Sequence, residues 1–201
     1  MDRRRKKAFE PHAHYNGMSV QGVKVSDIVA VNNLKHAWQF ILDTLDYPTD
    51  YPLVCKINQF VGGDNLIIRA GYLRNMPVSI GGTTWKPDMP IESQIKQEMA
   101  ENSPTDRALT MMLFLVRKQM FLDGNKQTSM LAGNHVMISN GCGISSVPIE
   151  LQPTFTGMLI RFYESNEMRE IKQFLYENCI DGIEFVPLSE QERKETEIWG
   201  R

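Results

Sequence analysis

The spacing of the apolar residues is the feature of this 201-residue chain that most restricts its fold. Over most of the length these residues recur every three or four positions, which gathers them on one side of an α-helix. We expect helices in the segments that begin near Ser26, Leu53, Ser103, Gly124, Leu151 and Met168, and a charged surface helix over residues 190–197. The chain is therefore predicted to be mainly α-helical.

Residues at the ends of these segments support them as helices. Ser26 or Asp27 can cap the first helix, and Gly62-Gly63 follows the second. Ser103-Pro104-Thr105-Asp106 supplies a capping hydroxyl, a proline in the first turn and an acidic residue that interacts favourably with the helix dipole. The helix that begins at Ser103 has a long apolar stripe for the core, formed by Ala108, Leu109, Met112, Leu113, Val116 and Met120.

Residues 65–80 depart from the helical spacing. They are rich in β-branched and aromatic residues on either side of Arg74-Asn75-Met76-Pro77, and Gly81-Gly82 follows them. This pattern predicts two strands joined by a turn. Because two strands alone are only marginally stable, we expect the β-hairpin to lie against the helices.

Composition excludes several classes of protein. Apolar residues make up 42% and charged residues 23% of the chain, as in ordinary globular domains. The longest apolar runs, such as residues 111–116, are far shorter than the roughly 20 residues of a membrane-spanning helix, so we expect no membrane partner. Three cysteines without a CxxC pair (Cys55, Cys142 and Cys179) predict reduced thiols in a cytoplasmic protein, with no disulfide framework or structural metal.

The N-terminus is strongly basic. Residues 3–7 are Arg-Arg-Arg-Lys-Lys, whereas the whole chain has a formal charge of −2. A nucleic-acid-binding arm would have this charge, but neither interleaved aromatic residues nor a basic helix face accompanies it. A solvated tail over residues 1–16 is the favoured interpretation, and residues 17–201 follow as a single domain without repeats or linkers.

The most informative segment is a turn between two helical stretches, Phe121-Leu122-Asp123-Gly124-Asn125-Lys126. A turn that leads into a helix leaves several N–H groups without partners and a partial positive charge at the helix start. Gly124 lets a phosphate approach the main chain closely, and Lys126 adds a cation. Asp123 is a suitable ligand for a divalent ion bound to phosphates. The same residues also form an ordinary capped loop, which turn chemistry alone favours.

Residues 119–130 resemble the core motif of the Fic/Doc family, commonly His-x-Phe-x-Asp/Glu-Gly-Asn-Gly/Lys-Arg-x-x-Arg between two helices. Residues 71–87 resemble the flap of that family, a hairpin that holds the target segment beside the nucleotide, and residues 130–141 resemble the helix after the motif. The resemblance spans residues 17–185. It implies a Fic-fold helical bundle with a β-hairpin flap. It also implies transfer of AMP from ATP to a Ser, Thr or Tyr hydroxyl of a target protein.

The resemblance also implies roles for particular residues. Asp123 would hold Mg²⁺, and the flap would pair with the target segment through Val78, Ile80 and Gly81. The catalytic positions are Gln119 (the histidine position), Asp123, Asn125 and Gln127 (the first arginine position). The nucleotide-binding positions are Phe121, Gly124, Asn125, Lys126 and Met130 (the second arginine position).

Three of these positions depart from the motif: Gln119, Gln127 and Met130. The amide of Gln119 cannot take the proton of an attacking hydroxyl, and loss of a positioned base costs about 10²–10⁴-fold in rate. The neutral amide of Gln127 does not replace the forked, charged phosphate contact of an arginine.

Residues 17–22 resemble the inhibitory motif of the family, with Gln21 in place of its glutamate; an accidental match of so short a fragment is an equal alternative.

Two functions follow from these departures. One is a protein adenylyltransferase-type enzyme that uses ATP and Mg²⁺ and whose activity is weak, altered or lost. The alternative is a non-catalytic module that binds a nucleotide or a protein and acts by sequestration or regulation. A homo-oligomer is also left open. Of the remaining residues, we expect His36 and His135 to pack within or on helices, Asn134 to bind a neighbouring main chain, and Trp85 either to dock the hairpin or to contact a ligand.

Overall fold

The computed structural model describes residue 22 and residues 24–92 and 103–182. Three sequence predictions lie outside these residues: the basic tail over 1–16, the inhibitory-motif positions 17–21 and the charged helix over 190–197. Within the described ranges, no helix is both long enough and apolar enough to cross a membrane.

Helices dominate the described structure, as the sequence predicts. They are α1 (Val25–Asp43), α2 (Tyr51–Val61), α4 (Pro104–Lys118), α5 (Asn125–Ser139), the 3₁₀-helix η2 (Ile149–Leu151), α6 (Gln152–Ser165) and α7 (Arg169–Asn178). Ser103 caps α4 as expected, because its Oγ accepts the N–H of Asp106 at 3.4 Å. Neither residue predicted to cap α1 does so: the helix begins one residue after Lys24, which makes no capping bond through its side chain.

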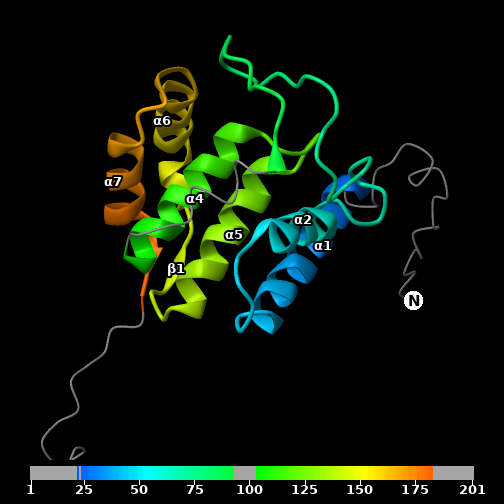
Figure 1. Cartoon of the computed structure of the whole chain (residues 1–201), viewed down its shortest axis with the longest axis horizontal. Helices are drawn as coiled ribbons and strands as arrows, with labels where there is room; N and C mark the ends of the chain where they lie inside the picture. The colour runs from blue at the N-terminus through cyan, green and yellow to red at the C-terminus, as the bar shows by residue number, and fades with distance from the viewer. Residues whose placement is uncertain (1–21, 23, 93–102, 183–201) are drawn as a thin grey trace, which may run out of the picture.

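The central helices are α4 and α5, with α1 and α2 on one side and α6 and α7 on the other (Figure 1). Two cores meet at α4. Toward α1, α2 and α5 the helix contributes Ala108, Met111, Phe114 and Leu115. Toward α6 and α7 it contributes Leu109, Met112, Leu113 and Val116. The single stripe predicted for this helix is therefore too narrow, since α4 is buried on both sides.

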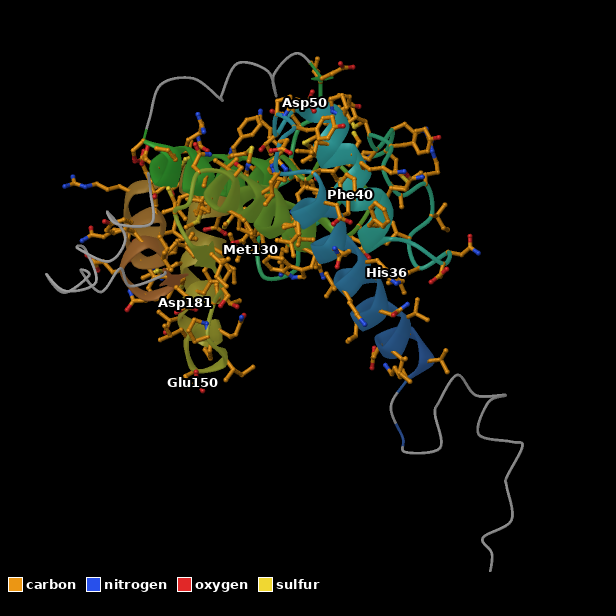
Figure 2. All side chains as sticks on the ribbon, turned by 90° about the horizontal axis from the view of Figure 1, so that it is seen from below. His36, Phe40, Asp50, Met130, Glu150 and Asp181 are labelled. Atoms are coloured by element: carbon orange, nitrogen blue, oxygen red, sulfur yellow. The ribbon has the colours of Figure 1, made fainter. Side chains whose placement is uncertain are left out.

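Buried polar side chains join the outer helices to this centre. His135 of α5 is fully buried, with Nε2 2.9 Å from the carbonyl of Thr44 and Nδ1 2.7 Å from Oγ1 of Thr49. This histidine ties α5 to the loop between α1 and α2, so the expected packing role is confirmed. His36 is exposed on α1, which extends away from the bundle (Figure 2).

The strands lie elsewhere than predicted. Among the described residues, β1 (Ile144–Ser145) and β2 (Ile180–Asp181) form one antiparallel pair, with Ile144 opposite Asp181. Residues 65–80 form an irregular loop instead of a hairpin. Asn65, Arg69 and Gly71 have positive φ angles of 60°, 57° and 80°, and such conformations interrupt an extended strand. The helical bundle is confirmed, and the placement of its strands over 65–80 is wrong.

Candidate functional site

A cavity of about 360 Å³ separates the loop that follows α2 from the turn before α5. Its volume lies in the range of small-molecule sites. The lining consists of two segments, Val78, Ser79, Ile80 and Gly81 on one side and Gln119, Leu122, Asp123, Asn125, Lys126 and Gln127 on the other. The structure therefore brings together the residues that the sequence assigns to the flap and most of those that it assigns to the motif.

The turn before α5 has the geometry of an anion-binding helix start. Gly124 caps the helix with a left-handed φ of 74°. Its N–H donates to Oδ1 of Asp123 at 2.7 Å. The next three N–H groups, those of Asn125, Lys126 and Gln127, precede the first residue that can bond back within the helix. A Cβ at position 124 would lie 2.9 Å from Cδ1 of Ile67, so both the backbone angle and the space require glycine.

Asn125 closes the turn with its side chain. Oδ1 accepts the N–H of Phe121 at 2.9 Å, and Nδ2 donates to the carbonyl of the same residue, also at 2.9 Å. The carboxamide of Asn125 thus holds the main chain of the turn, and Asn125 also forms part of the cavity lining.

Asn58 is a residue of the site that sequence reasoning missed. It is fully buried in α2, and Nδ2 donates to the carbonyl of Asp123 and to Oγ1 of Thr128, both at 3.1 Å. Its Oδ1 accepts the N–H of Gly71 at 2.8 Å. One amide therefore holds the motif turn and the start of the preceding loop together. The available signal was an asparagine on the apolar side of α2, between Val54 and Val61.

Gln119, at the histidine position of the motif, ends α4 in a left-handed conformation with φ 47° and ψ 59°. Its Nε2 donates to the carbonyl of Val116 at 2.7 Å. The side chain that borders the cavity is thus bonded to the last turn of its own helix.

Three residues assigned to nucleotide binding lie apart from the lining of this cavity. Gly124 is one of them, and it borders a smaller cavity instead. Phe121 is buried in the core shared by α1, α2, α4 and α5. Met130, labelled in Figure 2, packs against the core formed by α4, α6 and α7. The reason is helical geometry: Met130 lies on the second turn of α5, beyond the helix start that faces the cavity.

The charges that line the cavity are one cation, Lys126, and one anion, Asp123. Two nearby cations at the end of α4 contact aromatic rings: Arg117 lies 4.2 Å from the ring centroid of Trp85, and Lys118 lies 5.5 Å from that of Phe114. No cluster of three His, Cys, Asp or Glu side chains able to hold a metal occurs in the described part of the chain. The single carboxylate of Asp123 fits a Mg²⁺ ion whose other ligands are phosphate oxygens and water.

Trp85 docks the loop on the helices. Its ring stacks on Tyr163 of α6 at 5.9 Å between centroids, and Arg117 covers it. Burial raises the pKa of Tyr163 to about 12 and lowers the pKa of Arg117. Of the two roles left open for Trp85, these contacts support docking.

Asn134 has the structural role expected for it. Its Oδ1 accepts the N–H of Ser145 at 2.7 Å, and Nδ2 donates to the carbonyl of that residue at 2.8 Å. The amide fixes β1 against α5.

A second cavity, of about 220 Å³, lies on the other side of the turn. The start of α1 contributes Ser26, Asp27 and Ala30, and the motif contributes Asp123, Gly124 and Gln127. Gln127 therefore borders both cavities, and it is exposed.

Three solved structures illustrate the likeness of this architecture to known proteins. Residues 134–508 of Fic-1 from C. elegans are 20% identical with a TM-score of 0.60, over 82% of this chain and 51% of that one. A Fic domain containing signaling protein from Bacteroides thetaiotaomicron is 14% identical with a TM-score of 0.65, over 82% and 72% of the two chains. BepC, a VirB-translocated effector from Bartonella tribocorum with bound AMPPNP, is 11% identical with a TM-score of 0.53, over 82% and 96%.

The sequence by itself has no such match. No family model matches it, and no curated protein does. The chain spans about half of the Fic-1 fragment, 51% of its length. The shared architecture and the cavity between loop and motif lead to one conclusion: the chain has the fold of the Fic-domain proteins.

Proposed function

We propose that this chain is a Fic-family protein that binds a nucleotide phosphate at the start of α5 and a protein segment along residues 78–81. The observation that carries the proposal is the cavity of about 360 Å³ between these two parts of the chain. The AMPPNP molecule in the BepC structure supports a nucleotide as the ligand. The main chain at 78–81 lies outside helices and strands, so its N–H and C=O groups would be available to a target peptide.

The first turn of α5 supplies the contacts for phosphate. Its free N–H groups and the ammonium of Lys126 attract an anion, and Gly124 provides the left-handed cap from which the helix starts. Asp123 would hold Mg²⁺, which supplies charge neutralisation on the phosphates when it is bound. We assign Asp123 and Lys126 to nucleotide binding, and Val78, Ile80 and Gly81 to target binding.

Transfer of AMP to a target hydroxyl is proposed to be weak, altered or lost. In such a transfer the hydroxyl oxygen bonds to the α-phosphorus, the bond from that phosphorus to pyrophosphate breaks, and the hydroxyl proton leaves to a base. Gln119 offers an amide, which is no base, and Gln127 offers no charge to the departing phosphates. Adenylyltransferase chemistry would therefore lack both a base for the hydroxyl proton and a charged contact to the departing phosphates.

A non-catalytic binding module is the second candidate. The observation that favours it is the bond of 2.7 Å between Nε2 of Gln119 and the carbonyl of Val116. A side chain that caps its own helix stabilises the scaffold and leaves the attacking group without a partner. Such a module would act by sequestering or regulating its ligand.

A binding measurement tests the nucleotide part of both candidates. With AMPPNP and Mg²⁺ at a hundredfold excess over Kd, the folded state gains about 2.7 kcal/mol, which raises the melting temperature. Lys126→Gln reduces the rise, whereas Lys35→Gln, on the exposed face of α1, leaves it unchanged. A melting curve indifferent to AMPPNP, ATP and ADP would remove nucleotide binding from the proposal.

A labelling measurement separates the two candidates. The protein is incubated with ATP labelled on the α-phosphate, Mg²⁺ and a cell lysate. A retained transferase labels itself or a lysate protein, whereas a binding module shows ligand-dependent stabilisation and no label.

We also propose a reducing, cytoplasmic location, which the three free cysteines support.

A further inference from the structure

Arg74 is a buried arginine in the loop that follows α2. Only 3% of the residue is exposed. Its guanidinium donates to four main-chain carbonyls, and Nη1 also lies 3.2 Å from the sulfur of Met89. The side chain of Arg74 therefore joins four separate main-chain positions.

The contacts divide between the two walls of the cavity. On the motif side, Nε donates to the carbonyl of Gln119 at 2.6 Å, and the main-chain N–H donates to the carbonyl of Met120 at 2.9 Å. On the loop side, the guanidinium reaches both ends of the flap loop, which we define as residues 76–88. Its acceptors there are the carbonyls of Met76 at 2.9 Å, Pro87 at 3.2 Å and Asp88 at 2.5 Å.

The chemistry of this junction requires an arginine. A planar guanidinium directs five N–H groups in fixed directions and reaches acceptors on opposite sides at once. A lysine ammonium has three donors at one point and cannot span the same carbonyls. Burial lowers the pKa of Arg74, and the charge of Asp88 acts in the opposite direction.

The junction also restrains Gln119. Its left-handed conformation is uncommon for a residue other than glycine and persists where the surroundings hold it. The carbonyl of Gln119 is held by Arg74 and its side chain by Val116, so the main chain at the end of α4 is fixed from both sides.

We propose that Arg74 is a positioning residue that sets the separation of the two cavity walls, because it bonds simultaneously to the flap loop and to the end of α4. The flap loop and Gln119 consequently keep one relative position before any ligand arrives. The role of Arg74 in wall placement is independent of the ligand, and only its effect on affinity rests on the proposed function.

Amide hydrogen exchange tests the placement directly. In Arg74→Lys we expect two hydrogen-bonded amides to exchange about tenfold faster or more: that of Trp85 in the flap loop, which donates to Oγ1 of Thr83 at 3.1 Å, and that of residue 74, which donates to the carbonyl of Met120 at 2.9 Å. Amides of α2 and α5 should keep their rates. Arg161→Lys is the control, because Arg161 is an exposed arginine paired with Glu170 at 2.9 Å. Unchanged exchange in the flap loop of a folded Arg74→Lys protein overturns the proposal.

A ligand measurement on the same variants gives the functional consequence. We expect the affinity for AMPPNP with Mg²⁺ to fall about tenfold in Arg74→Lys and to stay constant in Arg161→Lys. If the unsubstituted protein does not bind AMPPNP, the proposed function fails, and hydrogen exchange still decides the role of Arg74. If affinity is equal in both variants while exchange differs, the walls are placed by Arg74 but ligand binding does not depend on it, which overturns the functional part.

A measurement on the unsubstituted protein covers the case in which Arg74→Lys does not fold. Nitrogen-edited NMR is expected to give a slowly exchanging Nε–H signal for Arg74, while the guanidinium of Arg161 exchanges rapidly with solvent. Rapid exchange at Arg74 as well would mean that the carbonyl contacts are not maintained, and the proposal would be wrong.

Discussion

The side chain of Asn125 forms two hydrogen bonds with one residue, Phe121, and so locks the turn of the motif into a ring. Both bonds measure 2.9 Å and involve the main chain of Phe121. The turn is therefore shaped by the protein alone, and a ligand would meet a preformed helix start.

Substitution of Asn125 should destabilise the fold. In Asn125→Ala the N–H and C=O of Phe121, a buried residue, lose their partners, at about 1–3 kcal/mol for each group left unsatisfied. Urea unfolding measures the loss. Asn178→Ala removes an exposed amide bonded to Phe174 and should cost only a few tenths of a kcal/mol, about the level of surface substitutions. Equal stability of the two variants would show that the ring of bonds does not form.

Two glycine-to-alanine substitutions should have opposite effects. Gly124→Ala places a Cβ at φ 74° and 2.9 Å from Ile67, and the left-handed angle alone costs about 1–2 kcal/mol. Gly157→Ala, inside α6, meets its nearest atom at 3.9 Å and should stabilise the protein by about 0.5–1 kcal/mol. Thermal unfolding of the two variants beside the unsubstituted protein is the measurement, and a loss of stability in both would contradict the account of Gly157.

Restoring the reactive groups tests whether the scaffold is intact. The double variant Gln119→His, Gln127→Arg should gain labelling from α-labelled ATP by about 10²–10⁴-fold, because it regains a base and a phosphate contact. Position 119 has a left-handed φ of 47°, a conformation in which histidine is enriched. Gln119→Asn with Gln127→Arg is the matched control, since asparagine accepts the same conformation and is no base. Equal labelling of the two would mean that position 119 does not deliver a base to the cavity.

Stability should fall at high pH through Tyr163. Burial raises the pKa of this phenol from its ordinary value of 10.0 to about 12. The unfolded phenol thus ionises first, so stability is complete below pH 10 and is lost as the pH rises to about 12, with a change on the order of 2 kcal/mol. Urea unfolding at pH 9, 10 and 11 measures the decline.

Tyr163→Phe should reduce that decline and cost nothing at neutral pH. The hydroxyl of Tyr163 is buried and has no hydrogen-bond partner among the described residues. Its removal leaves no group unsatisfied and is expected to be neutral or slightly stabilising. Tyr51, whose pKa is also raised to about 12, keeps part of the pH dependence. The exposed Tyr176 provides the control, and an unchanged pH profile in Tyr163→Phe would exclude Tyr163 as the source.

The sequence was sufficient for features encoded within a few residues. The cap at Ser103, the end of α2 at Gly62 and the start of α5 at Gly124 each depend on local backbone preferences, and all three lie where they were expected. The pairing of flap and motif followed from the resemblance, and the cavity lining agrees with it.

The missed features depend on contacts between distant residues. Asn58 and Arg74 donate to main-chain carbonyls of the motif that lie 65 and 45 positions away in the sequence. In the loop that stands in place of the strands predicted over residues 65–80, side chains of Asn58 and Arg74 bond to the N–H of Gly71 and the C=O of Met76. Local composition does not report such substitutes for pairing.

The position of α4 between two cores has a consequence for how this scaffold tolerates change. Its stability comes from side chains along the helix, whereas Gln119 lies just past the helix end, is half-buried and belongs to neither core. Replacing the reactive group therefore removes little of the free energy that holds the bundle together. Under the proposed function, an enzyme and a non-catalytic binding module would share this bundle and differ in a few side chains at the end of α4 and the start of α5.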